Sequence, residues 1–292
     1  MKKTIIPLLL GMLISGCSTD SDMEKKNIQS FTASLENTPS RTFMEDGKYI
    51  CWTKDDRITI FKGTTYGQEY VFDGVTGDRT GTFTPITEEN EIGSLNANYA
   101  VYPHTYLNGI DDSGVMTVQL PANQDYAENS FGVGASTMVA VTKDINDRSL
   151  SFKNTCGCLK LKLYGDNVTV KSIVLQGNNK EPIAGDAIVT CNYGENPTLK
   201  MGTYTTKTIT LHCEGKGVRI GNSAETATTF WLVVPPITFT KGFSITVNNV
   251  GVDFVKSTSK NISIERNVIL PMSAALTEGT SGSLIIGNGW QN

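Results

Sequence analysis

The pattern of apolar residues divides the chain into two unlike parts. Residues 5–14 form a largely apolar run that follows Lys2 and Lys3 and leads through small residues to Cys17. A positive start, a short apolar core and small residues at the end are typical of a secretory signal. The run is about half of the roughly 20 residues that a membrane-spanning helix needs. The pattern therefore predicts a signal peptide over residues 1–16.

Beyond residue 27, apolar and polar residues alternate in short segments. Phe31, Ala33 and Leu35 are separated by polar residues, and similar runs follow to the end of the chain. Period two is typical of half-buried strands, and we find no sustained helical period in this part. After 31–35, the predicted strands lie at 58–60, 70–72, 99–102, 115–120, 137–141, 159–163, 171–175, 187–191, 208–213, 230–234, 243–247, 252–255, 267–270 and 284–286.

The strands fall into two series that meet near residue 154. Phe152 ends the first series and Leu159 opens the second. Short strands at close spacing favour sandwiches over a parallel α/β sheet, and each half has the length of one such domain. The sequence therefore predicts an all-β protein with two tandem β-sandwich domains, residues 28–154 and 155–292, after a polar tether at residues 17–27.

Composition supports this class and excludes one kind of partner. Of the 292 residues, 39% are hydrophobic and 18% charged, and 28 are Gly, as in all-β surface proteins with many turns. Loss of Lys2 and Lys3 with the signal would lower the formal net charge from −4 to −6. Since no basic tract remains, no nucleic-acid partner is predicted.

Residues that could carry catalysis are few and isolated. The two histidines, His104 and His212, have no motif around them, and each is predicted to be packed or solvated. There is no G-x-S-x-G, no H-E-x-x-H and no phosphate-binding loop. The sequence therefore predicts no enzymatic activity, no catalytic residues and no cofactor.

The segment from Leu13 to Cys17 resembles the lipobox of bacterial lipoproteins. In that family the Cys thiol is diacylated, the signal is removed before it, and the new amino terminus is usually acylated as well. Several acyl chains anchor a protein far better than one. The resemblance implies lipidation at Cys17. The acidic residues that follow it resemble signals that send lipoproteins to the outer face of the outer membrane.

Lipidation of Cys17 leaves five cysteines, and an odd number leaves at least one thiol outside any internal disulfide. The leucines that follow Cys158 define the buried face of their strand, which places Cys156 and Cys158 on the opposite, more exposed face. Cys191 and Cys213 share faces with apolar residues and are expected to point inward. Thiols on opposite faces do not converge on a zinc ion. We expect buried cysteines that pack as small apolar residues, with a Cys191–Cys213 disulfide as an alternative.

Two further groups of residues, paired aspartates and tryptophans, are candidates for a binding site. The pairs Asp55–Asp56 and Asp111–Asp112 are flanked by turn residues, and without an EF-type loop we expect them to cap turns rather than bind Ca²⁺. Trp52, Trp231 and Trp290 would form a sugar-stacking platform only if they were exposed together. Trp231 lies in an apolar strand and is expected in the core. No metal site and no specific glycan site are predicted.

Several motifs, taken in order, resemble the fimbrillin family, the two-domain lipoprotein pilins known as type V pilins. The resemblance spans about residues 28–276, with Asp55 where Gly is common in the family. The motifs are Arg41-Thr42-Phe43, Trp52 to Ile58 (WTKDDRI), Tyr99 to Pro103 (YAVYP), Leu120 to Gln124 (LPANQ), and Leu150 to Asn154 (LSFKN) followed by Leu159-Lys160-Leu161.

The resemblance implies two transthyretin-like β-sandwiches and a mode of assembly. In polymerising members, a protease cuts after an Arg near the mature N-terminus and removes the first strand. A strand of the next subunit then fills the groove, because unpaired sheet edges offer free N–H and C=O groups. Arg41 is the matching residue here. The alternative is an uncut loop residue, as in anchors and some tip subunits of the family.

The C-terminal segment has two alternative roles in such an assembly. A linker at residues 277–282 precedes Leu284, Ile285 and Ile286. The segment 283–287 is either a donor strand for a neighbouring subunit or a strand of its own domain, since three apolar residues hold little register information.

Taken together, the sequence predicts a non-enzymatic lipoprotein, held to the outer membrane at the cell surface through Cys17. It is expected to act as a pilus (fimbria) subunit or pilus-associated adhesin that assembles by strand addition. Its partners would be other pilin subunits and a host or microbial surface ligand. The alternative is a monomeric surface lipoprotein that binds glycans or another ligand on the same scaffold, because a sandwich fold hosts many functions.

Overall fold

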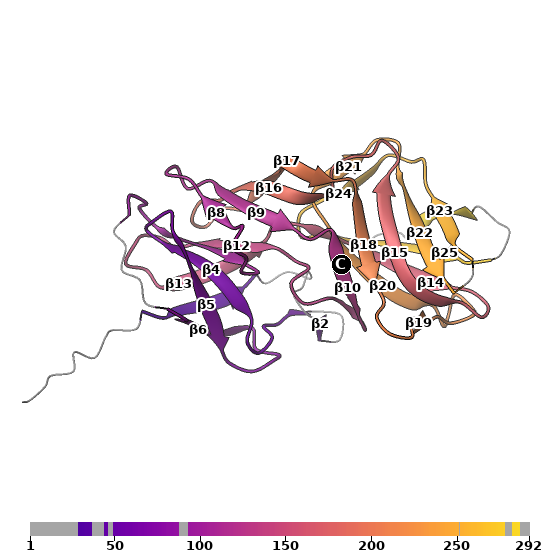
Figure 1. Cartoon of the computed structure of the whole chain (residues 1–292), viewed down its shortest axis with the longest axis horizontal. Coiled ribbons are helices and arrows are strands. Elements are labelled where there is room, and N and C mark those ends of the chain that lie inside the picture. Colours follow the sequence, from indigo (N-terminus) through magenta and orange to yellow (C-terminus); the bar gives the residue numbers. More distant parts are fainter. Residues whose placement is uncertain are drawn as a thin grey trace, which may run out of the picture.

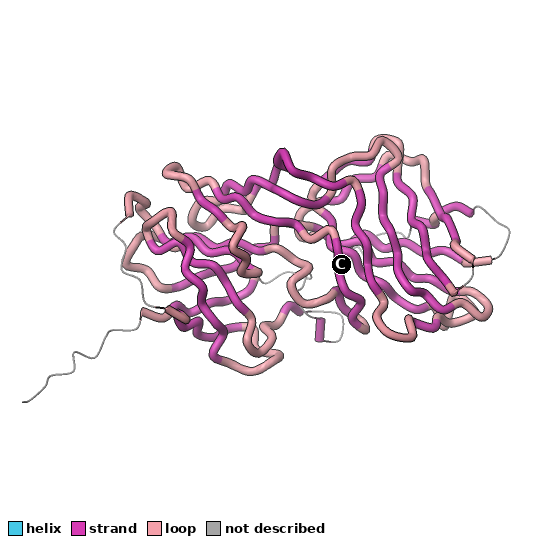
Figure 2. The backbone as a smooth tube through the Cα atoms, in the orientation of Figure 1, coloured by secondary structure: helices cyan, strands magenta, loops and turns pink. Residues whose placement is uncertain are grey.

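A computed structural model describes residues 29–36, 44–45, 49–87, 93–250, 252–277 and 282–286. These residues form β-strands joined by turns, in an elongated molecule whose two halves lie end to end (Figures 1 and 2). In this part of the chain no helix is long and apolar enough to cross a membrane. The all-β prediction is confirmed.

The N-terminal half contains a closed barrel. Its first strand, β1 (Phe31–Leu35), closes the barrel by pairing in parallel with β13 and antiparallel with β6. The order around the barrel is β1, β13 (Ser149–Asn154), β12 (Met138–Val141), β7 (Asn98–Tyr102), β4 (Arg57–Lys62), β5 (Gly67–Asp73) and β6 (Thr80–Pro85).

Aromatic side chains fill the barrel around Trp52. The ring of Trp52 lies 5.0 Å from Phe83, 5.4 Å from Phe152, 5.6 Å from Tyr102 and 6.0 Å from Phe72, centroid to centroid. Three of the four contacts are edge-on, the geometry that aromatic quadrupoles favour. Trp52 is fully buried and so belongs to the core rather than to a surface platform.

The turn before β4 positions Trp52. Asp55 has φ 65°, a left-handed conformation that favours glycine, which explains why Gly is common here in the family that the sequence resembles. Asp56 caps the turn: its Oδ2 accepts the Thr53 N–H at 2.7 Å, and its Oδ1 accepts the Tyr102 hydroxyl at 3.1 Å. The prediction of turn capping is confirmed for Asp56, whereas Asp55 supplies the left-handed position of the turn.

Asp56 is expected to make stability fall as the pH rises. Burial raises the pKa of this carboxyl from 3.8 to about 6, although hydrogen bonds from Thr53 and Tyr102 oppose the rise. The folded state therefore binds the proton more tightly than the unfolded state. The resulting stabilisation is complete below pH 3.8 and is lost as the pH rises through about 6.

Asp56→Asn should remove this slope, which amounts to about 1–3 kcal/mol between pH 4 and 7 in the unaltered chain for a shift of this size. Urea unfolding at pH 4, 5, 6 and 7 measures the effect. Asp111→Asn is the control, because Asp111 is an exposed loop carboxyl whose pKa is lowered. A slope between pH 4 and 6 that persists in Asp56→Asn would refute the assignment.

The C-terminal half is built of two sheets around a separate core that includes Leu161, Ile173, Phe230 and Phe243. The first sheet has the order β11 (Ser130–Phe131), β10 (Asn123–Ala127), β18 (Thr208–His212), β15 (Thr169–Gly177), β22 (Phe243–Asn249), β23 (Phe254–Ser257) and β26 (Gly282–Ser283), with β19 (Val218–Arg219) beside β15. The second has the order β20 (Thr228–Val234), β14 (Gly157–Tyr164), β25 (Ile269–Ala275) and β27 (Ile285–Ile286).

A further sheet combines strands from both halves, and we call it the linking sheet. β9 pairs with β16 across the boundary expected near residue 154. Figure 1 shows these strands running from the barrel toward the C-terminal half. The order is β17 (Thr198–Thr206), β16 (Ala184–Thr190), β9 (Met116–Leu120) and β8 (Gly109–Ile110). Two short pairs complete the described strands: β2 (Met44–Glu45) with β3 (Tyr49–Ile50), and β21 (Ile237–Phe239) with β24 (Ile262–Ile264).

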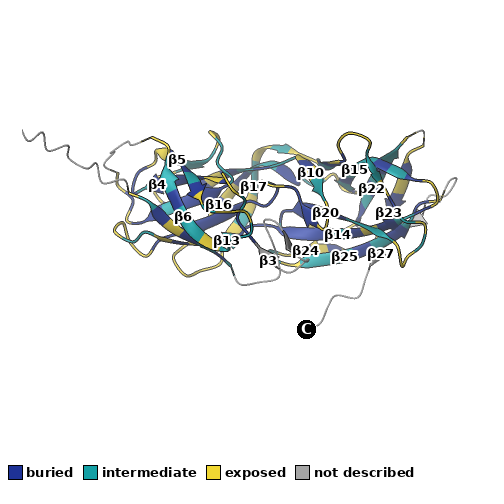
Figure 3. Ribbon diagram, turned by 90° about the horizontal axis from the view of Figure 1, so that it is seen from below, coloured by how far each residue is buried: buried dark blue, intermediate teal, exposed yellow. Residues whose placement is uncertain are grey.

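The linking sheet covers a core of its own. Val118 and Ala187 on its inner face pack with Val101 from the outer surface of the barrel, and with Trp231 and Val233 from β20. Figure 3 shows buried residues continuing through the middle of the molecule. The two halves are therefore joined by a shared apolar core.

This core corrects the prediction for two cysteines. Cys156 and Cys158, which we expected on an exposed face, are both buried, because the face that they share with Lys160 lies against the linking sheet. Cys191 packs in the same core, whereas Cys213 lies in the C-terminal core, so the inward orientation predicted for both is confirmed. Among the described cysteines none forms a disulfide.

Candidate functional site

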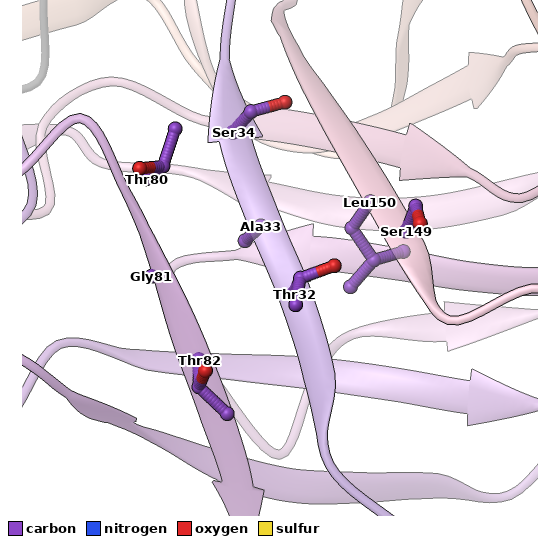
Figure 4. Close-up of a pocket in the computed structure, with 8 residues that line it drawn as sticks. All are labelled: Thr32, Ala33, Ser34, Thr80, Gly81, Thr82, Ser149 and Leu150. Atoms are coloured by element: carbon purple, nitrogen blue, oxygen red, sulfur yellow. The ribbon is translucent and has the colours of Figure 1, made fainter.

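The strand β1 and the groove that holds it are the feature with the clearest functional meaning. Figure 4 shows β1 lying between β6 and β13. Residues 32–35 are in register with 149–152 on one side, and residues 31–34 with 83–80 on the other. Both edges of β1 are therefore paired, and its removal would open the barrel along the edges of β6 and β13.

The inward side chains of β1 follow a large–small–large pattern. Phe31, Ala33 and Leu35 are all buried in the barrel core. Ala33 lies opposite Gly81, and a Cβ built on Gly81 would stand 2.3 Å from the ring of Phe72. Phe72 thus fills the space beside Gly81, and the inward side chains of β1 alternate large, small and large.

The outer face of the same region is open. A shallow hollow of about 320 Å³ runs along β1 and is lined mainly by small residues (Figure 4). Its residues are Thr32, Ala33, Ser34, Thr80, Gly81, Thr82, Ser149 and Leu150. Small-molecule sites are usually deeper and largely apolar, so this lining fits access to the strand better than a cofactor pocket.

A charged contact holds the end of β1. Glu36 follows Leu35 directly, and its carboxylate accepts two parallel hydrogen bonds from the Arg266 guanidinium, from Nη1 to Oε2 at 2.9 Å and from Nη2 to Oε1 at 3.1 Å. The backbone N–H of Asn154 also donates to Glu36 Oε2, at 3.2 Å. The side chains of Arg266 and Glu36 are only 18% and 14% exposed. This contact ties β1 to the C-terminal half.

The turn that carries Arg266 is fixed by contacts that do not involve β1. Asn267 has φ 62°, and its N–H donates to the Cys156 carbonyl at 2.8 Å. Its side-chain oxygen accepts a hydrogen bond from Asn154 at 3.1 Å, and the Arg266 guanidinium also donates to the Asn154 carbonyl at 2.9 Å. Arg266 is therefore oriented toward the groove independently of Glu36.

Sequence reasoning did not find this contact. Glu36 and Arg266 lie 230 positions apart, and neither belongs to a motif that the sequence displays. A charge in a loop is usually solvated, so no local signal distinguishes these two from other surface charges. Only the docking of the turn between β24 and β25 beside β13 brings them together.

The expected processing and anchoring sites, Arg41 and Cys17, lie outside the described residues. The predicted donor segment is partly described. Leu284 is buried in the C-terminal core and its N–H donates to the Ser257 carbonyl at 3.0 Å. Ile285 and Ile286 are in register with β25 of the same chain. Donation of this segment to another subunit stays a prediction.

The histidines and Asp111 make local polar contacts. His104 Nδ1 lies 2.9 Å from Thr59 Oγ1, and burial lowers the pKa of this histidine. His212 is exposed and contacts Asn123. Asp111 accepts hydrogen bonds within its own loop. Within the described ranges, no group of three or more His, Cys, Asp or Glu side chains is arranged to hold a metal ion. Trp231 is buried, as predicted.

Comparison with known proteins places the fold. No family model matches the chain, and no curated protein matches it. A candidate cell adhesion protein from Bacteroides ovatus has a similar structure, with a TM-score of 0.50 and 11% identity over 91% of this chain and 99% of that one. A second, from Bacteroides uniformis, has a TM-score of 0.48 and 17% identity over 90% and 99%. The tip fimbrial protein Mfa3 from Porphyromonas gingivalis has a TM-score of 0.36 and 9% identity over 89% and 98%.

Other fimbrial proteins are also among the solved structures to which this chain is similar. At these identities the likeness concerns the fold, and the match to the candidate cell adhesion protein from Bacteroides ovatus covers nearly the whole of both chains.

Proposed function

We propose that this protein is a non-enzymatic fimbrial subunit or pilus-associated adhesin of the bacterial surface, tethered to the outer membrane through acylated Cys17. In this proposal the lipid holds the uncut precursor, and cleavage after Arg41 separates both acylated Cys17 and β1 from the rest of the chain. A strand from another subunit then takes its place between β6 and β13. The closure of the barrel by its first strand is the observation that carries the proposal.

The physics of the groove supports strand addition. After cleavage, β1 would be held by non-covalent contacts alone, among them its backbone ladders, its three buried side chains and the contacts of Glu36. Loss of β1 would expose two sheet edges and an apolar core, which is unfavourable in water. A strand from a neighbour restores both the hydrogen bonds and the burial. The same strand therefore completes the barrel and joins the two subunits.

Recovery of the protein from the cell surface tests this proposal. We expect an N-terminus at Thr42 in assembled material, SDS-stable ladders on gels, and loss of both in Arg41→Ala. Arg219→Ala is the control, since Arg219 is exposed and lies far along the chain from the cut. Cys17→Ala should move the uncut protein out of the membrane fraction.

Three other results would each contradict a different part of the proposal. A mature protein that begins at acylated Cys17 and forms no ladder would exclude the cleaved, polymerising subunit and leave an anchor or tip subunit. A single band of monomer mass with affinity for a glycan would favour the alternative of a monomeric binding lipoprotein. An unlipidated product would overturn the anchoring by Cys17.

A further inference from the structure

The end of the β1 groove contains a charge whose partner belongs to the strand itself. Glu36 is the residue directly after β1, so its carboxylate leaves the barrel whenever β1 leaves. The Arg266 guanidinium and the Asn154 N–H, which both donate to that carboxylate, remain with the body of the protein. The vacated groove therefore ends in an oriented set of donors.

Such a set favours a carboxylate over other groups. Arginine stays charged at any physiological pH, and its planar fork matches the two oxygens of a carboxylate. At 18% exposure the Arg266 side chain has little access to water, so a strand that leaves it without an anion is disfavoured. Because Asn267 holds the turn, the guanidinium need not reorganise to meet an incoming strand.

We infer that Arg266 and the backbone N–H of Asn154 form a carboxylate site that selects the partner strand. This inference rests on the proposed function, since it concerns the strand that replaces β1. The selected strand has a large, a small and a large inward residue at alternate positions, followed directly by Asp or Glu. Phe31, Ala33, Leu35 and Glu36 are the chain's own copy of this pattern.

The charge requirement also disfavours one source of the strand. Residues 281–292 of this chain contain no Asp or Glu, although they include the apolar segment 284–286. In the structure that segment pairs within its own C-terminal half. The segment 284–286 of a second copy would therefore bring no acidic side chain to Arg266. The partner strand that we propose belongs to another subunit and carries Asp or Glu directly after its last inward residue.

A strand-exchange experiment tests the site. The chain from residue 18, with the recognition sequence of a site-specific protease inserted after Arg41, is cut so that β1 remains as a non-covalent segment. Amidated, fluorescent peptides of residues 29–36 (QSFTASLE) then compete for the groove, and anisotropy gives their relative Kd. The matched peptides are Glu36→Gln and the double change Ser34→Glu with Glu36→Gln, which keeps the net charge but moves its position.

We expect the Glu36→Gln peptide and the moved-charge peptide to bind roughly 10- to 100-fold more weakly than the unaltered peptide, as the loss of charged hydrogen bonds implies. In Arg266→Met the preference should fall to within about twofold, and Arg266→Lys should retain part of it because lysine lacks the fork. The peptide comparison on the unaltered chain decides the matter even if Arg266→Met does not fold.

Two results would overturn the inference, and they differ in whether they also contradict the proposed strand addition. Equal binding of the unaltered peptide and the Glu36→Gln peptide to the unaltered chain would eliminate the carboxylate site while leaving strand addition intact. Failure of every peptide to enter the cut chain, under conditions in which β1 is released, would eliminate strand addition at this groove and the carboxylate site with it.

Discussion

Trp52→Ala should lower the free energy of unfolding by about 3–5 kcal/mol, as is typical for the removal of a large buried aromatic side chain. Trp52 is fully buried, and its ring contacts four other aromatic rings that come from β5, β6, β7 and β13. Alanine would leave a cavity at the point where these strands meet, and a ring of fixed strands has little freedom to collapse into it.

Urea unfolding followed by circular dichroism measures this loss. Trp52→Phe should recover part of it, because phenylalanine keeps the edge-on contacts while filling less space. Tyr106→Ala is the control: Tyr106 is 93% exposed, and its replacement should change the free energy of unfolding by less than about 0.5 kcal/mol. A loss below about 1 kcal/mol for Trp52→Ala would contradict the central role given to this residue.

Gln124→Leu should cost about 2–5 kcal/mol, because it leaves two buried backbone groups without partners at about 1–3 kcal/mol each. Gln124 is buried, and its Nε2 donates to the Val233 carbonyl at 2.8 Å while its Oε1 accepts the Val233 N–H at 2.9 Å. Val233 lies in β20, the last strand of its sheet, so one glutamine amide supplies the pairing that a neighbouring strand would give.

The same denaturation experiment tests this, with Gln119→Leu as the matched control. Gln119 also donates a side-chain hydrogen bond, to Asp186 at 2.7 Å, but it is only partly buried and water can replace that bond. We expect the control to lose less than about 1 kcal/mol. Similar losses for the two variants would show that the backbone of β20 does not depend on Gln124.

The contact of Gln124 also explains a motif. The segment Leu120 to Gln124 resembles a pattern of the fimbrillin family, but the sequence offers no physical reason for the glutamine. The structure supplies the reason, since β10 leaves the N-terminal half here and joins the C-terminal sheet. The glutamine connects that crossing strand to the second sheet of the sandwich.

Strands with a clear alternation were predictable, and strands without one were not. Residues 31–35 and 159–163 were expected as strands and are found in β1 and β14. β17 was missed because it lies at the edge of its sheet, where no residue is fully buried and the apolar signal is lost. β25 was expected to end at Leu270, before Pro271, yet it continues to Ala275. The pairing partners of β25 on both sides outweigh the one donor that proline lacks.

The sequence by itself determined the all-β class, the inward residues of the strands and the turn at Asp55 and Asp56, because these depend on alternation and on turn chemistry within a few residues. The tertiary structure decided the rest. Burial of Cys156 and Cys158 requires the linking sheet, and the carboxylate site requires that Arg266 dock 230 positions away from Glu36. These features depend on which surfaces pack together in the folded protein. Such packing between distant segments produces no periodic pattern in the sequence.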